Sequence, residues 1–251
     1  MSRTLAFIQA RMSSSRLPGK VLELLQGEPL IVYMARRAAR ARRLDGVVVV
    51  TSTDPSDDAL AAACAQASMA VFRGDLNDVL KRYAEAAEEH DAGVIVRLTG
   101  DCPLIDPVVI DAVIALRQAQ GADYASNVDP PSFPDGLDVE CFTRATLDHA
   151  AHRAALASER EHVTLWMRSA AAGLRRANHR ALVDLSHLRL TVDYPDDLAL
   201  VRALLLRLSD KPSFDLFDVL RELSAQAGLT ELNQHSRNEG LARSLAEEGK
   251  T

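Results

Sequence analysis

Residues 5–20 read LAFIQARMSSSRLPGK, and the fold prediction starts from this stretch. It opens with an apolar strand-like run, residues 5–9, and continues into a loop with three serines and a Pro-Gly pair. Further strand-like runs follow at 47–52, 70–72 and 94–98. Stretches with helical spacing of apolar residues separate them, at about 30–43, 56–67 and 77–90. Because runs such as VVVVTS and GVIVRLT are apolar almost throughout, the sequence predicts an α/β fold whose mostly parallel central sheet carries helices on both faces.

The second half of the chain departs from this alternation. Asp106 followed by Pro107 predicts the start of a helix that reaches about Gln120. Residues 128–187 then interrupt the series with a proline-containing loop that returns as a strand, and two helices are expected at 144–155 and 158–172. A late strand at 188–193, a helix at 196–208 and a helical stretch from about 214 complete the chain. We expect a single domain, 1–251, in which 128–187 is an inserted subdomain or dimer arm.

Composition restricts the class of partner. The chain is 47% hydrophobic and 25% charged, as in ordinary globular proteins, and its formal net charge is −6. This balance provides no positive field for a nucleic acid, so none is expected as a partner. Cys64, Cys102 and Cys141 lie far apart without a CxxC pair, which favours a reducing, cytoplasmic location. No apolar run near residue 1 is long enough for a signal peptide or a membrane span, and no membrane partner is expected.

The loop after the first strand carries Arg11, Arg16 and Lys20. In open α/β sheets ligands bind outside the carboxyl ends of the strands, and serine and glycine let backbone N–H groups approach phosphate oxygens. Three cations at this place predict a triphosphate site. The loop is not a Walker P-loop, because the glycine before GK is missing and Val21 follows Lys20, and no GxGxxG motif is present. The alternative is a solvated basic loop.

Two aspartates stand where strand-like runs end. Asp101 stands in RLTGDCPLIDP after the run at 94–98, and Asp193 stands in LTVDYPDD as the last residue of the run at 188–193. Mg²⁺ takes one or two carboxylates together with substrate phosphates, so this pair predicts a metal site next to the basic loop. The alternative for each aspartate is a cap on the helix that follows it.

Seven motifs occur in an order that resembles the SpsF-like cytidylyltransferases: QARMSSSRLPGK, FRGDLNDVLKRY, RLTGDCPLIDP, FPDGLDVECF, SEREHVT, LTVDYPDDL and NQHSRNEG. This family is similar to the CMP-sialic acid and CMP-Kdo synthetases, and the resemblance covers essentially the whole chain. It implies a three-layer, Rossmann-like nucleotidyltransferase fold. Ser13 replaces a glycine usual in the family loop, so the loop is strained here if that position has a positive φ.

The resemblance also implies roles for individual residues. The nucleotide, CTP, would be bound by Gln9, Ala10, Arg11, Ser13, Arg16, Lys20, Arg73 and Asp101. The catalytic group would be Arg11, Lys20, Asp101 and Asp193, with Mg²⁺ on Asp101 and Asp193. A small acidic, sugar-like acceptor would contact Asp135, Asp138, Glu140, Arg160, Glu161 and His162, which places the acceptor partly in the excursion at 128–187.

The expected reaction is in-line attack of an acceptor oxygen on the α-phosphorus of CTP, with pyrophosphate as the leaving group. The expected acceptor is a sugar acid or a related polysaccharide precursor, and the protein is expected to be a homodimer. A polyol phosphate or a phosphonate remains an alternative acceptor. A glycosyltransferase that consumes a nucleotide sugar is a second alternative, although TGDCP lacks the second aspartate of a DxD motif. A nucleotide-binding scaffold without turnover is the third.

Overall fold

A seven-stranded sheet forms the centre of the computed structural model, which describes residues 2–211, 213–226, 228–229, 233, 235–237 and 239–249. The strand order is β5-β4-β1-β6-β8-β7-β9. Within this sheet β8 runs antiparallel to its two neighbours, and the other pairings are parallel. The strands are β1 Arg3–Gln9, β4 Gly46–Ser52, β5 Ala70–Gly74, β6 Ala92–Thr99, β7 Tyr124–Ser126, β8 Glu140–Thr143 and β9 Arg176–Asn178, and a separate hairpin joins β2 Leu24–Leu25 to β3 Glu28–Pro29.

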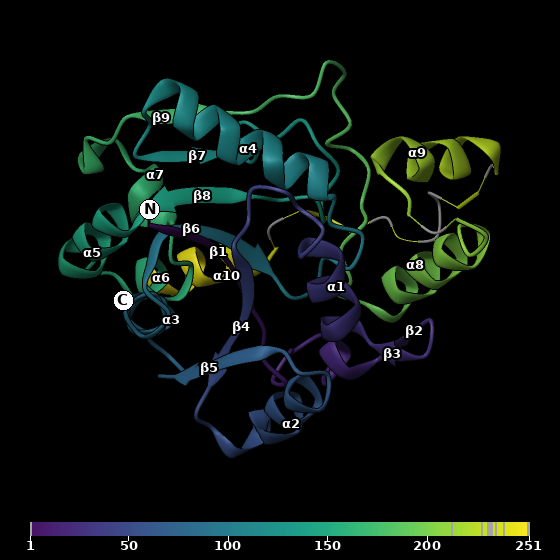
Figure 1. Cartoon of the computed structure of the whole chain (residues 1–251), viewed down its shortest axis with the longest axis horizontal. Helices are drawn as coiled ribbons and strands as arrows, with labels where there is room; N and C mark the ends of the chain where they lie inside the picture. Colours follow the sequence, from purple (N-terminus) through teal and green to yellow (C-terminus); the bar gives the residue numbers. More distant parts are fainter. Residues whose placement is uncertain are drawn as a thin grey trace.

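Helices cover both faces of this sheet (Figure 1). Alternate residues of β1 show the division, because Ala6 and Ile8 belong to one apolar cluster and Leu5 and Phe7 to the other. The first cluster contains α1 Leu30–Ala38, α2 Asp58–Gln66, α4 Pro107–Gln120, α8 Pro195–Arg207 and α9 Leu216–Ala225. The second contains α3 Val79–Glu89, α5 Arg144–Arg153 and α7 Leu165–Arg168. The prediction of an α/β fold with a mostly parallel, doubly covered sheet is confirmed.

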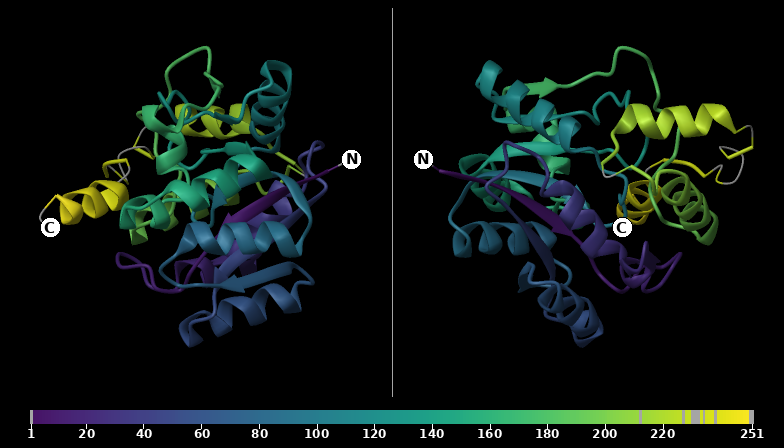
Figure 2. Two further views of the ribbon diagram at one scale, coloured as in Figure 1. Left: turned by 90° about the vertical axis from the view of Figure 1, so that its left-hand side faces the viewer. Right: turned by 45° about the vertical axis from the view of Figure 1, so that its right-hand side comes forward.

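The remaining described helices are short or lie near the end of the chain. They are α6 Ala157–Glu161, α10 Glu239–Glu248 and the 3₁₀ turns Lys20–Leu22, Pro55–Asp57 and Ala170–Ala172. Figure 2 shows α10, in yellow, extending outward from the body of the molecule, and α10 contacts α6. No helix among the described residues is long and apolar enough to cross a membrane.

Predicted and observed elements agree best in the first half of the chain. The helix expected from Asp106–Pro107 is α4, with Asp106 accepting a hydrogen bond from the N–H of Val108. The helix expected at 158–172 is wrong as one element. Val163 has a φ of 55°, which ends α6 before α7 begins and separates the segment into short helices.

The strand expected at 188–193 is also wrong. This segment is extended, but it crosses the carboxyl ends of the sheet strands instead of joining them. Its backbone bonds to loops: the N–H of Leu190 donates to the carbonyl of Asp135 at 2.6 Å, and the N–H of Val192 donates to that of Asp101 at 2.8 Å. Within the excursion at 128–187, by contrast, β8 and β9 lie in the central sheet.

Candidate active site

Two adjoining cavities lie where β1 and β6 end. The loop-side cavity, about 370 Å³, is lined by the loop after β1 and by residues of α3, α6 and α10. The inner cavity, about 210 Å³, is lined by the loop 135–138, β8, α7 and the start of α10. The two cavities share six residues: Arg16, Arg97, Thr99, Asp101, His162 and Asp193. Because these six residues form the boundary between them, the two cavities make one bipartite site.

The loop after β1 is fixed at its start by a buried carboxylate. The N–H of Met12 donates to Asp57 Oδ1 at 2.7 Å, and Thr51 Oγ1 donates to Asp57 Oδ2 at 2.9 Å. Gly19, with a φ of 74°, makes the left-handed turn that brings its N–H to the carbonyl of Met12 at 3.0 Å and returns the chain to Lys20. Ser13 is not among the described residues with positive φ, so its side chain does not strain the loop.

The Lys20 ammonium lies between the two predicted metal-binding carboxylates. Its Nζ donates to Asp101 Oδ2 at 3.0 Å, to Asp193 Oδ1 at 2.8 Å and to the carbonyl of Val192 at 2.7 Å. Arg16 forms a further ion pair with Asp193. The structure thus brings together residues that are 81 to 173 positions apart in the sequence.

These contacts fix the charges of the groups at neutral pH. Burial opposes the charge on Lys20, but Asp101 and Asp193 outweigh it and raise the pKa of the ammonium. Burial likewise opposes the charge on Asp101, and Lys20 outweighs it, so the pKa of that carboxyl is lowered. The pKa of Asp193 is lowered for the same reason, with Arg16 contributing. Lysine and both aspartates are therefore ionised.

The donor set suits a hard divalent cation. Asp101 and Asp193 present carboxylate oxygens to one shared cation, Lys20, and oxygen is the donor that Mg²⁺ prefers. Two carboxylates leave the other positions of an octahedral ion for phosphate oxygens and water. Asp101 and Asp193 could therefore hold a metal ion if Lys20 turned toward a phosphate.

A second carboxylate cluster, Asp196 and Asp197 with His235, is not suited to a metal. Asp197 is fully buried, and both of its oxygens accept hydrogen bonds from Arg189. Asp197 Oδ2 also accepts the backbone N–H of Asp193 at 2.8 Å. Asp197 therefore holds the turn that carries Asp193.

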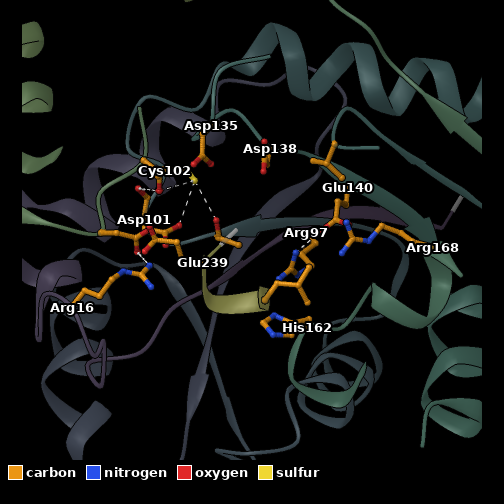
Figure 3. Close-up of a pocket in the computed structure, with 15 residues that line it drawn as sticks. Arg16, Arg97, Asp101, Cys102, Asp135, Asp138, Glu140, His162, Arg168 and Glu239 are labelled. Carbon is orange, nitrogen blue, oxygen red and sulfur yellow. Dashed lines mark hydrogen bonds and ion pairs between the residues drawn. The ribbon is translucent and has the colours of Figure 1, made fainter. Parts of the chain in front are cut away.

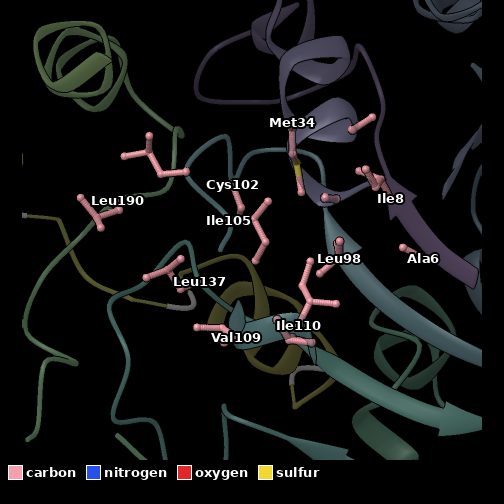
Figure 4. Packing of buried hydrophobic residues seen from close by; sticks show 14 of the residues in the cluster. Ala6, Ile8, Met34, Leu98, Cys102, Ile105, Val109, Ile110, Leu137 and Leu190 are labelled. Atoms are coloured by element: carbon pink, nitrogen blue, oxygen red, sulfur yellow. The ribbon is translucent and has the colours of Figure 1, made fainter. Parts of the chain in front are cut away.

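The wall of the inner cavity formed by residues 135–138 is carboxylate-rich. Figure 3 shows Asp135 and Asp138 on this wall. Gly136 has a φ of 103°, and a Cβ there would lie 2.5 Å from the carbonyl carbon of Leu190, so only glycine lets the loop pass this close to the segment 188–193. Apolar side chains pack behind the same loop, with Leu137, Leu190 and Cys102 in one cluster (Figure 4).

The opposite wall of the inner cavity carries arginines. Arg97 on β6 forms a buried ion pair with Glu140 on β8, its partner in strand register. Glu140 also accepts from the hydroxyls of Tyr124 at 2.6 Å and Thr164 at 2.7 Å. Burial opposes the charge on Glu140, but Arg97 outweighs it and lowers the pKa of that carboxyl. Arg168 lines the same wall, and its buried Nε has no hydrogen-bond partner among the residues that the structure describes.

Most of the predicted site residues line the two cavities. Those on the loop side are Gln9, Ala10, Arg11, Arg16, Lys20, Asp101, Glu161, His162 and Asp193. Those on the inner side include Asp135, Asp138 and Glu140.

Three predicted residues do not line either cavity. Ser13 is exposed on the loop, whereas Ser14 and Ser15 line the loop-side cavity. Arg73 donates to the carbonyls of Ser52 and Asp54, which ties β5 to the end of β4. Arg160 pairs with Asp78 and donates to two carbonyls at the end of α5, so its guanidinium holds α6 against α3 and α5.

Sequence reasoning missed several lining residues. Arg97 was hidden inside an otherwise apolar strand, although a charge in such a run is itself a sign of a buried partner. Arg168 and Glu239 had no comparable signal, because each lies in an amphipathic or polar stretch that reads as an ordinary surface helix. Asp57, which lines neither cavity but holds the loop at Met12, was missed because an acidic residue near a helix start is commonly a cap.

Comparisons with known proteins agree with this geometry. A family model described as cytidylyltransferase matches residues 5–198, which is more than three-quarters of the chain. The chain belongs to the cytidylyltransferase family. It is therefore a nucleotidyltransferase enzyme, as the order of the seven motifs indicated.

Individual relatives extend the likeness beyond the matched residues. The spore coat polysaccharide biosynthesis protein SpsF of Bacillus subtilis is 32% identical over 240 residues, covering 89% of this chain and 95% of that protein. A 3-deoxy-manno-octulosonate cytidylyltransferase of Anaeromyxobacter sp. (strain Fw109-5) is 30% identical, with 82% and 98% covered. A solved cytidylyltransferase from Leptospira borgpetersenii serovar Hardjo-bovis superposes with a TM-score of 0.87 at 29% identity, covering 94% of this cytidylyltransferase and all of that chain.

Proposed function

We propose that this cytidylyltransferase transfers CMP from CTP to a sugar acid in a Mg²⁺-dependent reaction that releases pyrophosphate. The observation that carries the proposal is the position of the Lys20 ammonium, which contacts Asp101 and Asp193 at the boundary of the two cavities. A relative named for 3-deoxy-manno-octulosonate, a sugar acid, supports the acceptor class.

The loop-side cavity suits the nucleotide. Arg11, Arg16 and Lys20 would bind the triphosphate, and Gln9 and Ala10 line the same cavity next to the end of β1. Cations fixed on a short loop neutralise phosphate charge without reorganising during the reaction, which is the main electrostatic contribution that phosphoryl transfer needs. Arg11 pairs with Glu161 at 3.6 Å across the cavity, and both side chains are partly exposed, so the pair can open for a phosphate.

Asp101 and Asp193 would hold Mg²⁺ beside the basic loop that would bind the phosphates. A bound Mg²⁺ would withdraw electron density from the α-phosphate and neutralise charge on the leaving pyrophosphate. Arg189 and Asp197 keep Asp193 oriented, since Arg189 Nη2 donates to Asp193 Oδ2 at 3.0 Å and Asp197 accepts the backbone N–H of Asp193. Lys20, released from the carboxylates, would bind a phosphate oxygen of CTP.

The inner cavity suits the acceptor. Its position beside Asp101 and Asp193 would place an acceptor hydroxyl next to the α-phosphorus, opposite the leaving group. In the reaction the hydroxyl oxygen forms the new bond to phosphorus as the bond to pyrophosphate breaks, and the hydroxyl proton passes to solvent. Asp135, Asp138 and Glu239 offer oxygens to sugar hydroxyls, and Arg168 offers an unpartnered N–H to an acidic group.

A phosphorylated polyol or a phosphonate is the second candidate acceptor, because either could place an oxygen at the same phosphorus. The glycosyltransferase alternative has no support from a DxD motif, and the family match is to cytidylyltransferases. We also retain the proposal that the protein is a homodimer and that the excursion at 128–187 contributes to its contact surface. Leu182 and Val183 in this excursion are strongly exposed.

Pyrophosphate release tests the proposal. The four nucleoside triphosphates are incubated with sugar acids, sugar phosphates and phosphonates, with Mg²⁺ or with EDTA. We expect release only with CTP, a sugar acid and Mg²⁺. Asp101→Asn should lower kcat by about 100-fold or more, whereas Asp148→Asn, which alters an exposed carboxylate on α5, should not. Undiminished turnover in EDTA, or release from CTP with phosphonates alone, would contradict the proposal.

A further inference from the structure

The C-terminal segment, the described residues of 235–248, lies beyond the residues that match the family model. It nevertheless lines both cavities. Glu239 and Leu241 line the inner cavity, and Ser244 and Glu247 line the loop-side cavity. A segment that faces both the nucleotide side and the acceptor side is placed to respond to both substrates.

The contacts of this segment are made to site residues. Arg237 donates to Asp138 on the wall of the inner cavity, and the hydroxyl of Tyr194 donates to Glu239 Oε2 at 2.7 Å. On the loop side, Ser244 Oγ lies 3.0 Å from His162 Nε2 and donates to Glu161 Oε2 at 3.1 Å.

The far end of α10 is attached to α6. The N–H and Oγ of Ser158 donate to the two carboxylate oxygens of Glu248, at 2.6 and 2.7 Å. Figure 1 shows α10 beside α6, and the two helices contact each other. The C-terminal segment therefore bridges the loop 133–138, the start of α8 and α6, which surround the two cavities.

The attachment is made of partly buried polar contacts. Leu245 of α10 is 46% exposed, whereas Leu200 of α8 and Val219 of α9 are buried in the main core cluster. Because water can replace these hydrogen bonds when the segment opens, opening it costs less free energy than unfolding a helix buried in the core. Such a segment can admit substrates by opening and retain them by closing.

We propose that the C-terminal segment is a lid that closes over the bound nucleotide and acceptor, with Glu239 contacting the acceptor. The inference rests on the proposed function. Closure excludes water from the α-phosphorus of CTP. If water entered, its oxygen would bond to that phosphorus as the bond to pyrophosphate broke and its proton passed to solvent, giving CMP and pyrophosphate without product. The lid thus couples CTP consumption to acceptor transfer.

Variants at the far end of α10 test this coupling. Glu248→Gln and Ser158→Ala weaken the attachment, and neither residue lines a cavity. Glu222→Gln is the matched control. Glu222 lies on α9, forms an ion pair with Arg207 on α8 and lines neither cavity. The measurement is the ratio of pyrophosphate released to CMP-acceptor formed. We expect a ratio near one for the unmodified chain and the control, and a rise of about three-fold or more for the lid variants. Equal ratios in all four proteins would overturn the proposal.

Two further measurements separate the lid from the proposed function. Glu239→Gln should raise KM for 3-deoxy-manno-octulosonate about ten-fold with KM for CTP unchanged, and an equal effect on both constants would refute the contact with the acceptor. Hydrogen exchange of residues 239–248 should slow when CTP and Mg²⁺ bind, and this readout does not require turnover. If the unmodified chain turns over none of the acceptors yet α10 is protected by CTP, the proposed function fails and the lid stands. Turnover with unchanged exchange would refute the lid alone.

Discussion

Replacing Lys20 with methionine removes the cation that lies between Asp101 and Asp193. The Lys20 side chain is 9% exposed, and its Nζ makes three hydrogen bonds of 2.7–3.0 Å. Asp193 keeps Arg16 and Arg189 as partners, but Asp101 keeps no cation at this distance among the described residues. Removing one partner of a buried pair costs about 3–5 kcal/mol. Because Asp101 is 25% exposed, we expect the lower end, about 3 kcal/mol, or a Tm decrease of about 6–12 °C.

The loss should depend on pH in a definite direction. Lys20 lowers the pKa of Asp101 and of Asp193, so the stability it provides is complete above the pKa values of these groups in the unfolded chain. In the variant, burial is no longer opposed by Lys20 and raises the pKa of Asp101, so lowering the pH protonates this unpaired carboxyl and removes its charge. The difference in the free energy of unfolding between the two proteins should therefore be largest near pH 7 and shrink toward pH 3.

Magnesium provides the second readout. In the free protein Lys20 competes with a metal for the two carboxylates, so Lys20→Met should bind Mg²⁺ more tightly without nucleotide. At ten times its Kd a ligand adds about 1.4 kcal/mol of stability. Urea unfolding at pH 7 with and without Mg²⁺ measures both effects. Lys81→Met, which alters an exposed i,i+4 pair with Glu85, is the control and should change stability by less than about 1 kcal/mol. Equal Mg²⁺ stabilisation of the unmodified chain and Lys20→Met would refute the reasoning.

Three further outcomes follow from the same geometry. Asp57→Ala should lower the free energy of unfolding, measured in urea, by about 3 kcal/mol, because it leaves buried donors unpaired. The same variant should raise KM for CTP. An unchanged KM would mean that the hydrogen bond to Met12 does not fix the loop. Burial raises the pKa of Asp138 to about 6 against the opposing effect of Arg237, so KM for the acceptor should rise as the pH falls below about 6, and a flat profile from pH 5 to 8 would contradict this. If the excursion forms a dimer contact, Leu182→Asp should lower the sedimentation coefficient from dimer to monomer, and an unmodified chain that sediments as a monomer would end the dimer proposal.

The first half of the fold was predictable because local signals and tertiary structure agree there. Strands β1, β4 and β6 are apolar on both faces, and the loops after parallel strands must gather at one edge of the sheet. That rule alone places Asp101 near Lys20. The second half was harder to predict, because β8 enters the sheet antiparallel between β6 and β7, a pairing that no local pattern specifies.

Asp193 shows how a site residue can be predicted through a wrong element. It was expected at the end of a strand, but it follows an extended segment whose N–H groups bond to Asp135 and Asp101 and whose carbonyl at Val192 accepts from Lys20. Alternating apolar and polar residues indicate an extended chain, but they do not show which segment forms hydrogen bonds with its backbone N–H and C=O groups. The prediction of Asp193 as a site residue therefore depended on the extended conformation of residues 188–193 and not on their pairing in the sheet.

Charge balance at this point favours one order of binding under the proposed function. Lys20, Arg16 and Arg189 together supply three positive charges to the two carboxylates, Asp101 and Asp193, so no negative charge is left over to attract a metal ion alone. A metal ion arriving alone must displace the ammonium from both carboxylates and brings no phosphate oxygens to replace them. A metal arriving with CTP brings phosphate oxygens to which Lys20 can turn, so the displaced ammonium exchanges carboxylate partners for phosphate partners within the same loop. The magnesium nucleotide is thus expected to bind as a unit. The acceptor would follow into the adjoining cavity, where Asp101 and Asp193 face both substrates.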